Sequence, residues 1–519
     1  MIESLCAIGF SGHRDLPNPD ALEHALDRLL DEIARKTTGR RMIGVCSTAI
    51  GADVIFIEAC LKRKLPWIAI LPMPPEVFFN IKDFPAEASR KNAMRLLETA
   101  ASVETTNPVP NLPGQDEHEY RHVAFTDSGR RIVDYCDLFI GALRTPLDPL
   151  KPGGTGEITE YAKLCHRPVA IIHPESGAIE HHRWHAPFGS GFMDQLSSLP
   201  EAPVRKDLLT VESSDERKTV VDFFGRLTTV ARHHVPRLRN VSSIAAILNG
   251  ALAVLALSLA LLPHWFKGLG GQMAHATNAV LSFFAALATG WFILRKPRER
   301  AARYRLGAEI CRSVIATWSL PETHRDIFRG LPPDYRDFVR TLLNLRRLEG
   351  PRLADLAAAA ERGVDSWRNE ITHYLNDRVK KQLNYYEGEQ RKADRRLYIF
   401  NPLIAIFGLG NFFIATTFAI AARVKGHPVI GDEGEHVVAF FKVAFPAVTA
   451  TFLAIVAARE ANRRKGRYGE MVQALKENAE RLISPPHERA AFDVVVDTER
   501  TLLAENIEWA NTTRYQAAT

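Results

Sequence analysis

Four long segments of the chain contain almost no charged residues. They are Val241–Leu262, Met273–Leu294, Tyr398–Ala422 and Val437–Ala458. A helix rises about 1.5 Å per residue and the hydrocarbon core of a bilayer is about 30 Å thick, so roughly 20 apolar residues cross it. The pattern predicts an all-α membrane region with four transmembrane helices in two hairpins. Buried helices of a large soluble domain are the alternative, but these usually carry a polar stripe and are shorter.

Before these segments, short apolar stretches alternate with amphipathic ones. The apolar stretches predict strands at Cys6–Phe10, Met42–Cys46, Trp67–Leu71, Leu138–Leu143 and Val169–Ile172. The intervening sequence predicts helices at Asp20–Lys36, Ala52–Lys64, Ala86–Ala100, His122–Tyr135 and Glu157–Cys165. Strands that alternate with helices form parallel sheets with helices on both faces. The predicted fold of residues 1–180 is therefore α/β, a Rossmann-like doubly wound parallel sheet.

The rest of the chain divides by composition. Residues 174–204 are rich in Pro, Gly, Ser and His and predict a linker, after which Glu212–Arg232 predicts a helix that enters the membrane. Charged helical stretches at Glu299–Leu320 and Ser366–Arg396 separate the hairpins. The predicted parts are 1–180, the α/β domain; 181–240, linker and entry helix; 241–295, first hairpin; 296–396, cytoplasmic helices; 397–458, second hairpin; and 459–519, a C-terminal cytoplasmic helix.

Basic residues flank the apolar segments on one side. They are Arg232, Arg237, Arg239, Arg295, Lys296, Arg298, Arg300, Arg391, Lys392, Arg395, Arg396, Arg459, Arg463, Arg464, Lys465 and Arg467. The hairpin loops hold only Lys267, Arg423 and Lys425. Because Lys and Arg stay on the cytoplasmic side, both termini and residues 295–396 are predicted to be cytoplasmic. The Met-Ile-Glu start has no signal-peptide pattern, so we expect the N-terminal domain to stay in the cytoplasm. With the four apolar segments, this predicts a multi-pass protein of the inner membrane.

The net charge of +6 reflects these flanks, and no basic stripe with interleaved aromatic residues predicts a nucleic-acid partner. The six cysteines have no C-x-x-C spacing and are expected to be reduced and buried. His181, His182 and His185 lie in the predicted linker without a matching set of Cys or Asp ligands. We therefore expect these histidines to be solvated, and we predict no metal site.

Three glycine-containing turns follow predicted strands. They contain Gly9, Ser11, Gly12, His13 and Arg14 in the first, Ser47, Gly51 and Asp53 in the second, and Gly153, Gly154, Thr155, Gly156, Glu157 and Glu160 in the third. In a doubly wound sheet, ligands bind beyond the carboxyl ends of the strands, where helix N-termini present free amides to an anion. The turns predict a phosphate-binding site in which a carboxylate contacts ribose hydroxyls.

Some of these residues also have structural interpretations. His13 and Arg14 can cap the turn or pair with Asp53. Glu157 and Glu160 can simply complement the N-terminus of a helix, an effect of typically 0.3–1 kcal/mol.

The Pro-Gly-Gly-Thr-Gly segment with Glu160, together with the Gly-Phe-Ser-Gly-His-Arg start and the Gly51-Ala52-Asp53 turn, resembles the SLOG superfamily of DprA-like and Lonely Guy proteins. The resemblance covers roughly residues 5–175. One position departs from it, because Glu157 stands where the family signature has Thr. The resemblance implies a nucleotide-binding domain, with Glu160 at its site.

The helical part resembles SLATT domains, two-helix membrane modules that accompany SLOG sensors in bacterial conflict systems. The residues that carry this likeness are Tyr374, Leu375, Arg378, Gln382, Tyr385 and Tyr386, with the basic segments Arg303-Tyr304…Glu309 and Arg467-Tyr468…Glu470. The resemblance implies a sensor of a nucleotide or cyclic-nucleotide messenger, coupled to a homo-oligomeric effector that opens a pore or disrupts the bilayer in antiphage defence. No cofactor is expected besides that ligand.

Polar residues inside the apolar segments are candidates for the pore. Lys442 lies near the start of the fourth segment, where it either snorkels to the interface or acts inside the membrane. Asn249, Asn278, Asn401 and Asn411 either join helices by hydrogen bonds or face water in a pore.

An enzyme is the alternative function, a membrane-anchored phosphoribohydrolase of nucleoside 5′-monophosphates. In that case Glu160 and Arg14 would stabilise an oxocarbenium-like transition state, but Glu157 would repel the phosphate.

Overall fold

The computed structural model describes residues 4–80, 86–107, 117–144, 153–185, 213–261, 297–355, 366–425, 432–458 and 461–515, together with 192–193, 196, 199–202, 208, 279–280 and 283. The chain forms two compact units. The first comprises residues 1–226 and 310–369, and the second comprises residues 227–309 and 370–519.

The first unit contains a seven-stranded sheet with the strand order β4-β3-β2-β1-β5-β6-β7. Neighbouring strands are parallel except β6 and β7, which are antiparallel. The strands are β1 Ser4–Gly12, β2 Arg40–Cys46, β3 Trp67–Leu71, β4 Ser102–Thr105, β5 Leu138–Ala142, β6 Val169–His173 and β7 Ala178–His182. The strand order reverses at β1 and β5, which gives the sheet its doubly wound topology.

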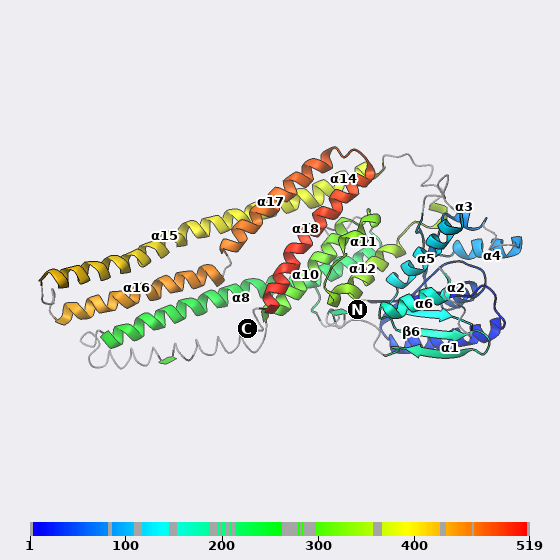
Figure 1. Ribbon diagram of the computed structural model, residues 1–519, viewed down its shortest axis with the longest axis horizontal. Coiled ribbons are helices and arrows are strands. Elements are labelled where there is room, and N and C mark those ends of the chain that lie inside the picture. Colours follow the sequence, from blue (N-terminus) through cyan, green and yellow to red (C-terminus); the bar gives the residue numbers. More distant parts are fainter. Residues whose placement is uncertain are drawn as a thin grey trace. The chain divides into compact units, whose positions relative to one another are not determined.

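Helices cover both faces of this sheet. Those between the strands are α1 Pro19–Lys36, α2 Ala52–Lys62, α3 Pro75–Phe78, α4 Glu87–Leu97, α5 Glu117–Tyr135 and α6 Thr155–Leu164 (Figure 1). Helices α1 and α2 pack together, as do α5 and α6. Successive residues of β1 face opposite sides of the sheet. Phe10 stacks on Phe56 of α2 on one side, and Gly9 faces Cys136, the residue after α5, on the other.

All five strands and five helices predicted for residues 1–180 are confirmed, with shifted ends. The prediction of a linker over residues 174–204 is wrong in part. Residues Ala178–His182 form β7, which pairs with β6 in the register Ile172 to Ile179. This edge strand has only one partly buried apolar residue, Ile179. Its sequence therefore lacks the apolar pattern from which strands are predicted. Strand β4 was also not predicted.

Helices of residues 310–369 complete the first unit. They are the end of α10 (Pro297–Ala316), η2 Pro321–Thr323, α11 His324–Ile327, η3 Pro333–Tyr335, α12 Arg336–Leu348 and the start of α14 (Ser366–Tyr374). Helix α12 packs at the amino end of β5, where Arg340 Nη1 lies 2.7 Å from Asp137 Oδ1. Asp137 in turn accepts a hydrogen bond of 2.8 Å from the Ala7 amide of β1. Because strands β1 and β5 are parallel, this docking edge is opposite the predicted ligand edge.

The second unit is helical. It contains most of α8 (Asp215–Leu261), the start of α10, the π-helical turn η4 Leu375–Val379, α15 Lys380–Lys425, α16 Asp432–Ala458, α17 Ala461–Ile483 and α18 Glu488–Tyr515. The predicted entry helix is continuous with the first apolar segment in α8. The third apolar segment is likewise the second half of α15, whose first half is the predicted cytoplasmic helix.

Within the part of the chain that the structure describes, two helical stretches are long and apolar enough to cross a membrane, Trp367–Ile414 and Val437–Val456. Only 6% and 11% of their most apolar windows are buried, whereas core helices of soluble proteins are mostly buried. In the first hairpin the structure describes a shorter apolar helix, Ala246–Leu255, and the predicted Met273–Leu294 lies almost wholly outside the described residues. The third and fourth predicted spans are thus supported by the described residues.

Candidate functional site

The carboxyl ends of β1 and β5 form the switch point of the sheet, where ligands bind in doubly wound folds. Strand β1 ends at Gly12, and the next amide, that of His13, donates to Ala142 O at 3.3 Å. Ser11 Oγ lies 3.4 Å from Thr155 Oγ1 at the start of α6. Residues from the first and third predicted turns therefore lie together at this edge.

The second predicted turn contacts the first. The Ala52 amide at the start of α2 donates to His13 O at 3.1 Å. Gly51 has φ +89°, and a side chain at this position would collide with the backbone of Arg14. A glycine is required here both for its left-handed conformation and for this close approach. The loops after β1 and β2 are consequently packed against each other beside the N-terminus of α2.

Asp53, in the first turn of α2, is buried at this contact. Burial raises its pKa from 3.8 to about 7, and hydrogen bonds from the Ala49 and Gly12 amides and the positive charge of Arg14 oppose the rise. The Ala49 amide lies 3.2 Å from Asp53 Oδ2. Asp53 thus ties the loop after β2 to the end of β1, and Arg14 is close enough to act on its charge.

The third predicted turn leads into α6. Gly153 has φ +73° and approaches Phe125 of α5, while Gly154 caps α6 with an ordinary φ of −82°. The Gly153 amide donates to Glu157 Oε2 at 2.7 Å, and Arg130 lies 3.1 Å from Glu157 Oε1. The Glu157 carboxylate therefore accepts a hydrogen bond from the first amide of the turn and is paired with a cation. These contacts give Glu157 a structural role, which was one of its two interpretations from the sequence.

Other predicted residues lie further from these contacts. Glu160 pairs with Lys163 at 2.6 Å, one turn along α6. Gly9 pairs with Val45 and Phe139 inside the sheet, where a side chain would meet Cys136 Sγ at 2.9 Å, so packing alone accounts for this glycine. Ser47 is half-buried directly after β2, and Gly156 is the second residue of α6.

Phe125 lies at the candidate site, and sequence reasoning missed it. The Arg14 guanidinium lies 5.6 Å from the centre of its ring, and Gly153 packs against its Cβ. Phe125 thus contacts both the first and the third turns from α5. An aromatic residue on an amphipathic helix is usually a core residue, so its sequence carried no signal of this position.

Three of the membrane candidates have described side chains, and all three are exposed. Lys442 is exposed on α16, and Asn401 is exposed on α15. Asn249 is exposed on α8. The side chain of Asn411 and the whole of Asn278 lie outside the described residues.

Among the described residues, no group of three His, Cys, Asp or Glu side chains could hold a metal ion. His181 stacks on Trp184, with the ring centres 4.9 Å apart.

Comparison with known families identifies one part of the chain. Residues 374–509 match the family model described as SMODS and SLOG-associating 2TM effector domain 1. This segment contains the apolar part of α15 and all of α16, so the two helices that meet the membrane criterion are the two that such a domain requires. No curated protein matches the chain. The resemblance of the C-terminal part to a two-helix membrane effector of conflict systems is therefore supported.

Proposed function

We propose that the chain is a sensor of a nucleotide-derived messenger coupled to an effector that permeabilises the membrane in bacterial antiphage defence. The observation that carries the proposal is the match of residues 374–509 to an effector domain associated with SLOG proteins. In this proposal, the N-terminal sheet supplies the sensor. The messenger is a nucleotide or cyclic nucleotide, and the active form is a homo-oligomer in the inner membrane.

Several features at the carboxyl edge of the sheet favour an anionic ligand. The N-terminus of α6 has no side-chain cap, and Thr155 beside it lies within reach of Ser11. Arg14 adds a cation, and Phe125 adds an aromatic surface next to it. A helix N-terminus with an Arg at its side favours phosphate, because amides and a planar guanidinium both bind its oxygens.

The phosphoribohydrolase alternative is less well supported. Glycosidic bond cleavage needs a carboxylate placed at the reacting sugar. Glu157 is held by Gly153 and Arg130, and Glu160 is paired with Lys163. Release of free base from nucleoside monophosphates by the purified chain would favour the enzyme.

The first hairpin is proposed to cross the membrane as well, giving four spans. In the second unit, a side chain at Gly250 of α8 would collide with Thr451 of α16, so the two helices approach each other closely at this position. Small residues at such contacts are typical of helices that associate in bilayers.

This topology predicts that residues 268–271 and 431–434 are outside the cytoplasm. Single cysteines placed in these loops should react with an impermeant thiol reagent in intact spheroplasts. Cysteines placed at Ser366 or Glu488 should react only after lysis. Labelling of the loops only after lysis would contradict the topology.

The sensor proposal is tested at Gly154. Because Gly154 has an ordinary φ, Gly154→Leu should leave the sheet folded and block the approach of a ligand to α6. The nucleotide that stays bound during purification is first identified by mass spectrometry. We expect its affinity, measured by calorimetry, to fall by about tenfold or more in the variant, which is about 1.4 kcal/mol. Dye release from liposomes should then lose its dependence on that nucleotide. Gly466→Leu, at an exposed glycine of α17 with open space around it and no left-handed φ, is the control. Unchanged affinity of Gly154→Leu would remove the site.

A further inference from the structure

The inward-facing positions of the long helical segment before α16 slip by one residue at the π-helical turn η4. One series of buried positions enters the turn from α14 and consists of Ile371 and Arg378, seven residues apart. The series that leaves the turn consists of Val379, Tyr386 and Ala393, also seven apart but one residue later; Arg378 and Val379 both lie in the turn itself. Phe400 and Phe407 continue this series and contact Phe452 of α16, with ring centres 5.9 Å apart in both pairs. A π turn accommodates one extra residue, which accounts for the slip.

A buried ion cluster holds the π turn. Arg378, 3% exposed at its side chain, donates to Glu309 Oε1 of α10 at 2.8 Å and to Glu499 Oε2 of α18 at 2.7 Å. Tyr374 OH donates to Glu499 Oε1 at 2.8 Å. The π turn thus lies where three segments of the second unit meet. Removing one carboxylate partner of a buried Arg strongly destabilises the structure that buries it.

The alternative register, in which the turn becomes α-helical with every residue retained, would place other side chains inward. These are Tyr385, Lys392, Ile399 and Ile406, which lie seven residues apart after Arg378 and are now exposed. In the membrane part the exchange replaces Phe400 and Phe407 by Ile399 and Ile406, so both registers have an apolar seam. Outside the membrane part, Lys392 would replace Ala393, which favours the observed register.

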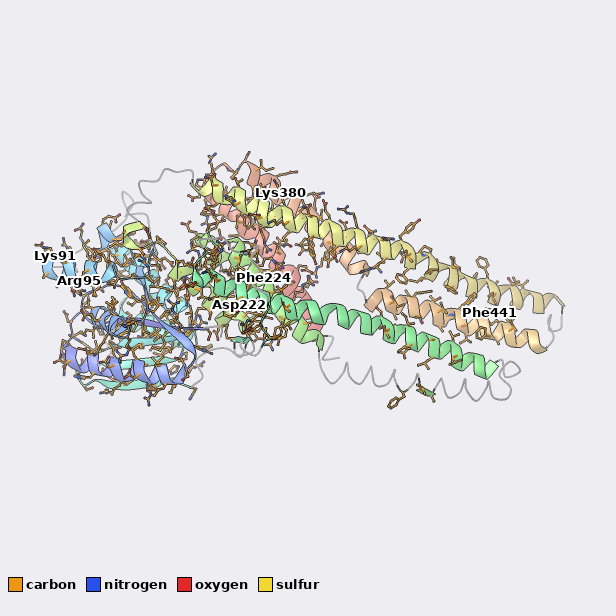
Figure 2. The ribbon with its side chains drawn as sticks, turned by 180° about the vertical axis from the view of Figure 1, so that it is seen from behind. Lys91, Arg95, Asp222, Phe224, Lys380 and Phe441 are labelled. Carbon is orange, nitrogen blue, oxygen red and sulfur yellow. The ribbon has the colours of Figure 1, made fainter. Side chains whose placement is uncertain are left out.

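We propose that η4 is a register switch for α15, and that the ion pairs of Arg378 keep it in the observed register. Conversion of the π turn to α-helix rotates α15 by about 100° and moves it by about 1.5 Å relative to α14. This would present a different face of α15 to α16 and to neighbouring subunits. The inference rests on the proposed function only in taking the switched register as the permeabilising one. Lys380, labelled in Figure 2, is the first residue of α15 after the turn.

Cross-linking of the full chain in liposomes tests the register directly. The resting pair is Phe407→Cys with Phe452→Cys, and the switched pair is Ile406→Cys with Phe452→Cys. A short thiol cross-linker and mass spectrometry give the yield of each. Glu309→Gln keeps the Arg378–Glu499 pair and removes one partner, so we expect the ratio of switched to resting product to rise by about tenfold, which corresponds to about 1.4 kcal/mol. Gly250→Cys with Thr451→Cys, between α8 and α16, should not change and shows that the variant is folded.

Deletion of Asn376 separates a switch from a general loosening. This exposed residue lies in the π turn, and its removal leaves Val379 seven residues after Ile371, so an unbroken α-helix keeps the observed register. In this background Glu309→Gln should give no switched product. An equal rise of switched product with and without Asn376, or no rise in either, would overturn the switch. Neither result depends on a ligand or on leakage, so a failed switch and a failed sensor remain distinguishable.

Discussion

Arg340→Met is expected to destabilise the first unit by about 3–5 kcal/mol, because it leaves Asp137 buried without its cation. The two side chains are only 6% and 7% exposed, and their charged atoms lie 2.7 Å apart. Burial raises the pKa of Asp137 and the Arg340 guanidinium opposes this rise, so removing Arg340 raises the pKa further. The loss would also weaken the docking of α12, whose Asn344 donates to Tyr135 O at 2.8 Å.

Thermal unfolding of the detergent-solubilised chain would measure this loss. Lys91→Met is the matched control, since Lys91 projects from α4 and its ion pair with Glu87 is about three-quarters exposed, where such pairs contribute about 0–1 kcal/mol (Figure 2). Asp137→Asn combined with Arg340→Met should regain much of the stability, because the carboxylate charge is then gone and the Asn side-chain oxygen can still accept from the Ala7 amide. A single variant as stable as Lys91→Met would show that the pair does not hold α12.

The interior of the sheet was predictable because its strands are buried on both faces. Strands such as β3, Trp67–Leu71, are entirely apolar, and sequence finds such runs. The two edge strands were not found, since β4 has one apolar residue, Val103, and β7 is polar and mostly exposed. An edge strand needs little apolar surface. Backbone hydrogen bonds to the neighbouring strand hold it in the sheet, and these leave no apolar pattern in its own sequence.

The position of the predicted turns followed from the rule that ligands bind at the carboxyl ends of strands. Their internal contacts did not, because these depend on residues distant in sequence. Glu157 was predicted as a ligand residue, and only the arrangement of α5 beside α6 reveals that Arg130 pairs with it. The same holds for Phe125 next to Arg14, and for Arg340, which meets Asp137 from 203 residues away. Local patterns contain no information about such partners.

The stability of the first unit is expected to fall as the pH rises from about 4 to 8, through the ionisation of Asp53. Its folded pKa of about 7 lies above the ordinary 3.8, so the folded state holds a proton that the unfolded state has lost. The stabilisation is complete below the unfolded pKa and is lost as the pH rises through the folded one. The contribution is at most about 4 kcal/mol, because each pKa unit is worth about 1.36 kcal/mol.

Asp53→Asn should remove this dependence, since an amide resembles the protonated carboxyl and can still accept from the Ala49 amide. We expect the variant to be more stable than the wild type at pH 8 and nearly equal to it at pH 4, in unfolding transitions followed across that range. Asp127→Asn, which removes an exposed carboxylate from the same unit, controls for the change in net charge. Parallel pH profiles for the wild type and Asp53→Asn would mean that Asp53 is ionised in the folded protein. Arg14 would then be its ion-pair partner rather than a cation available to phosphate.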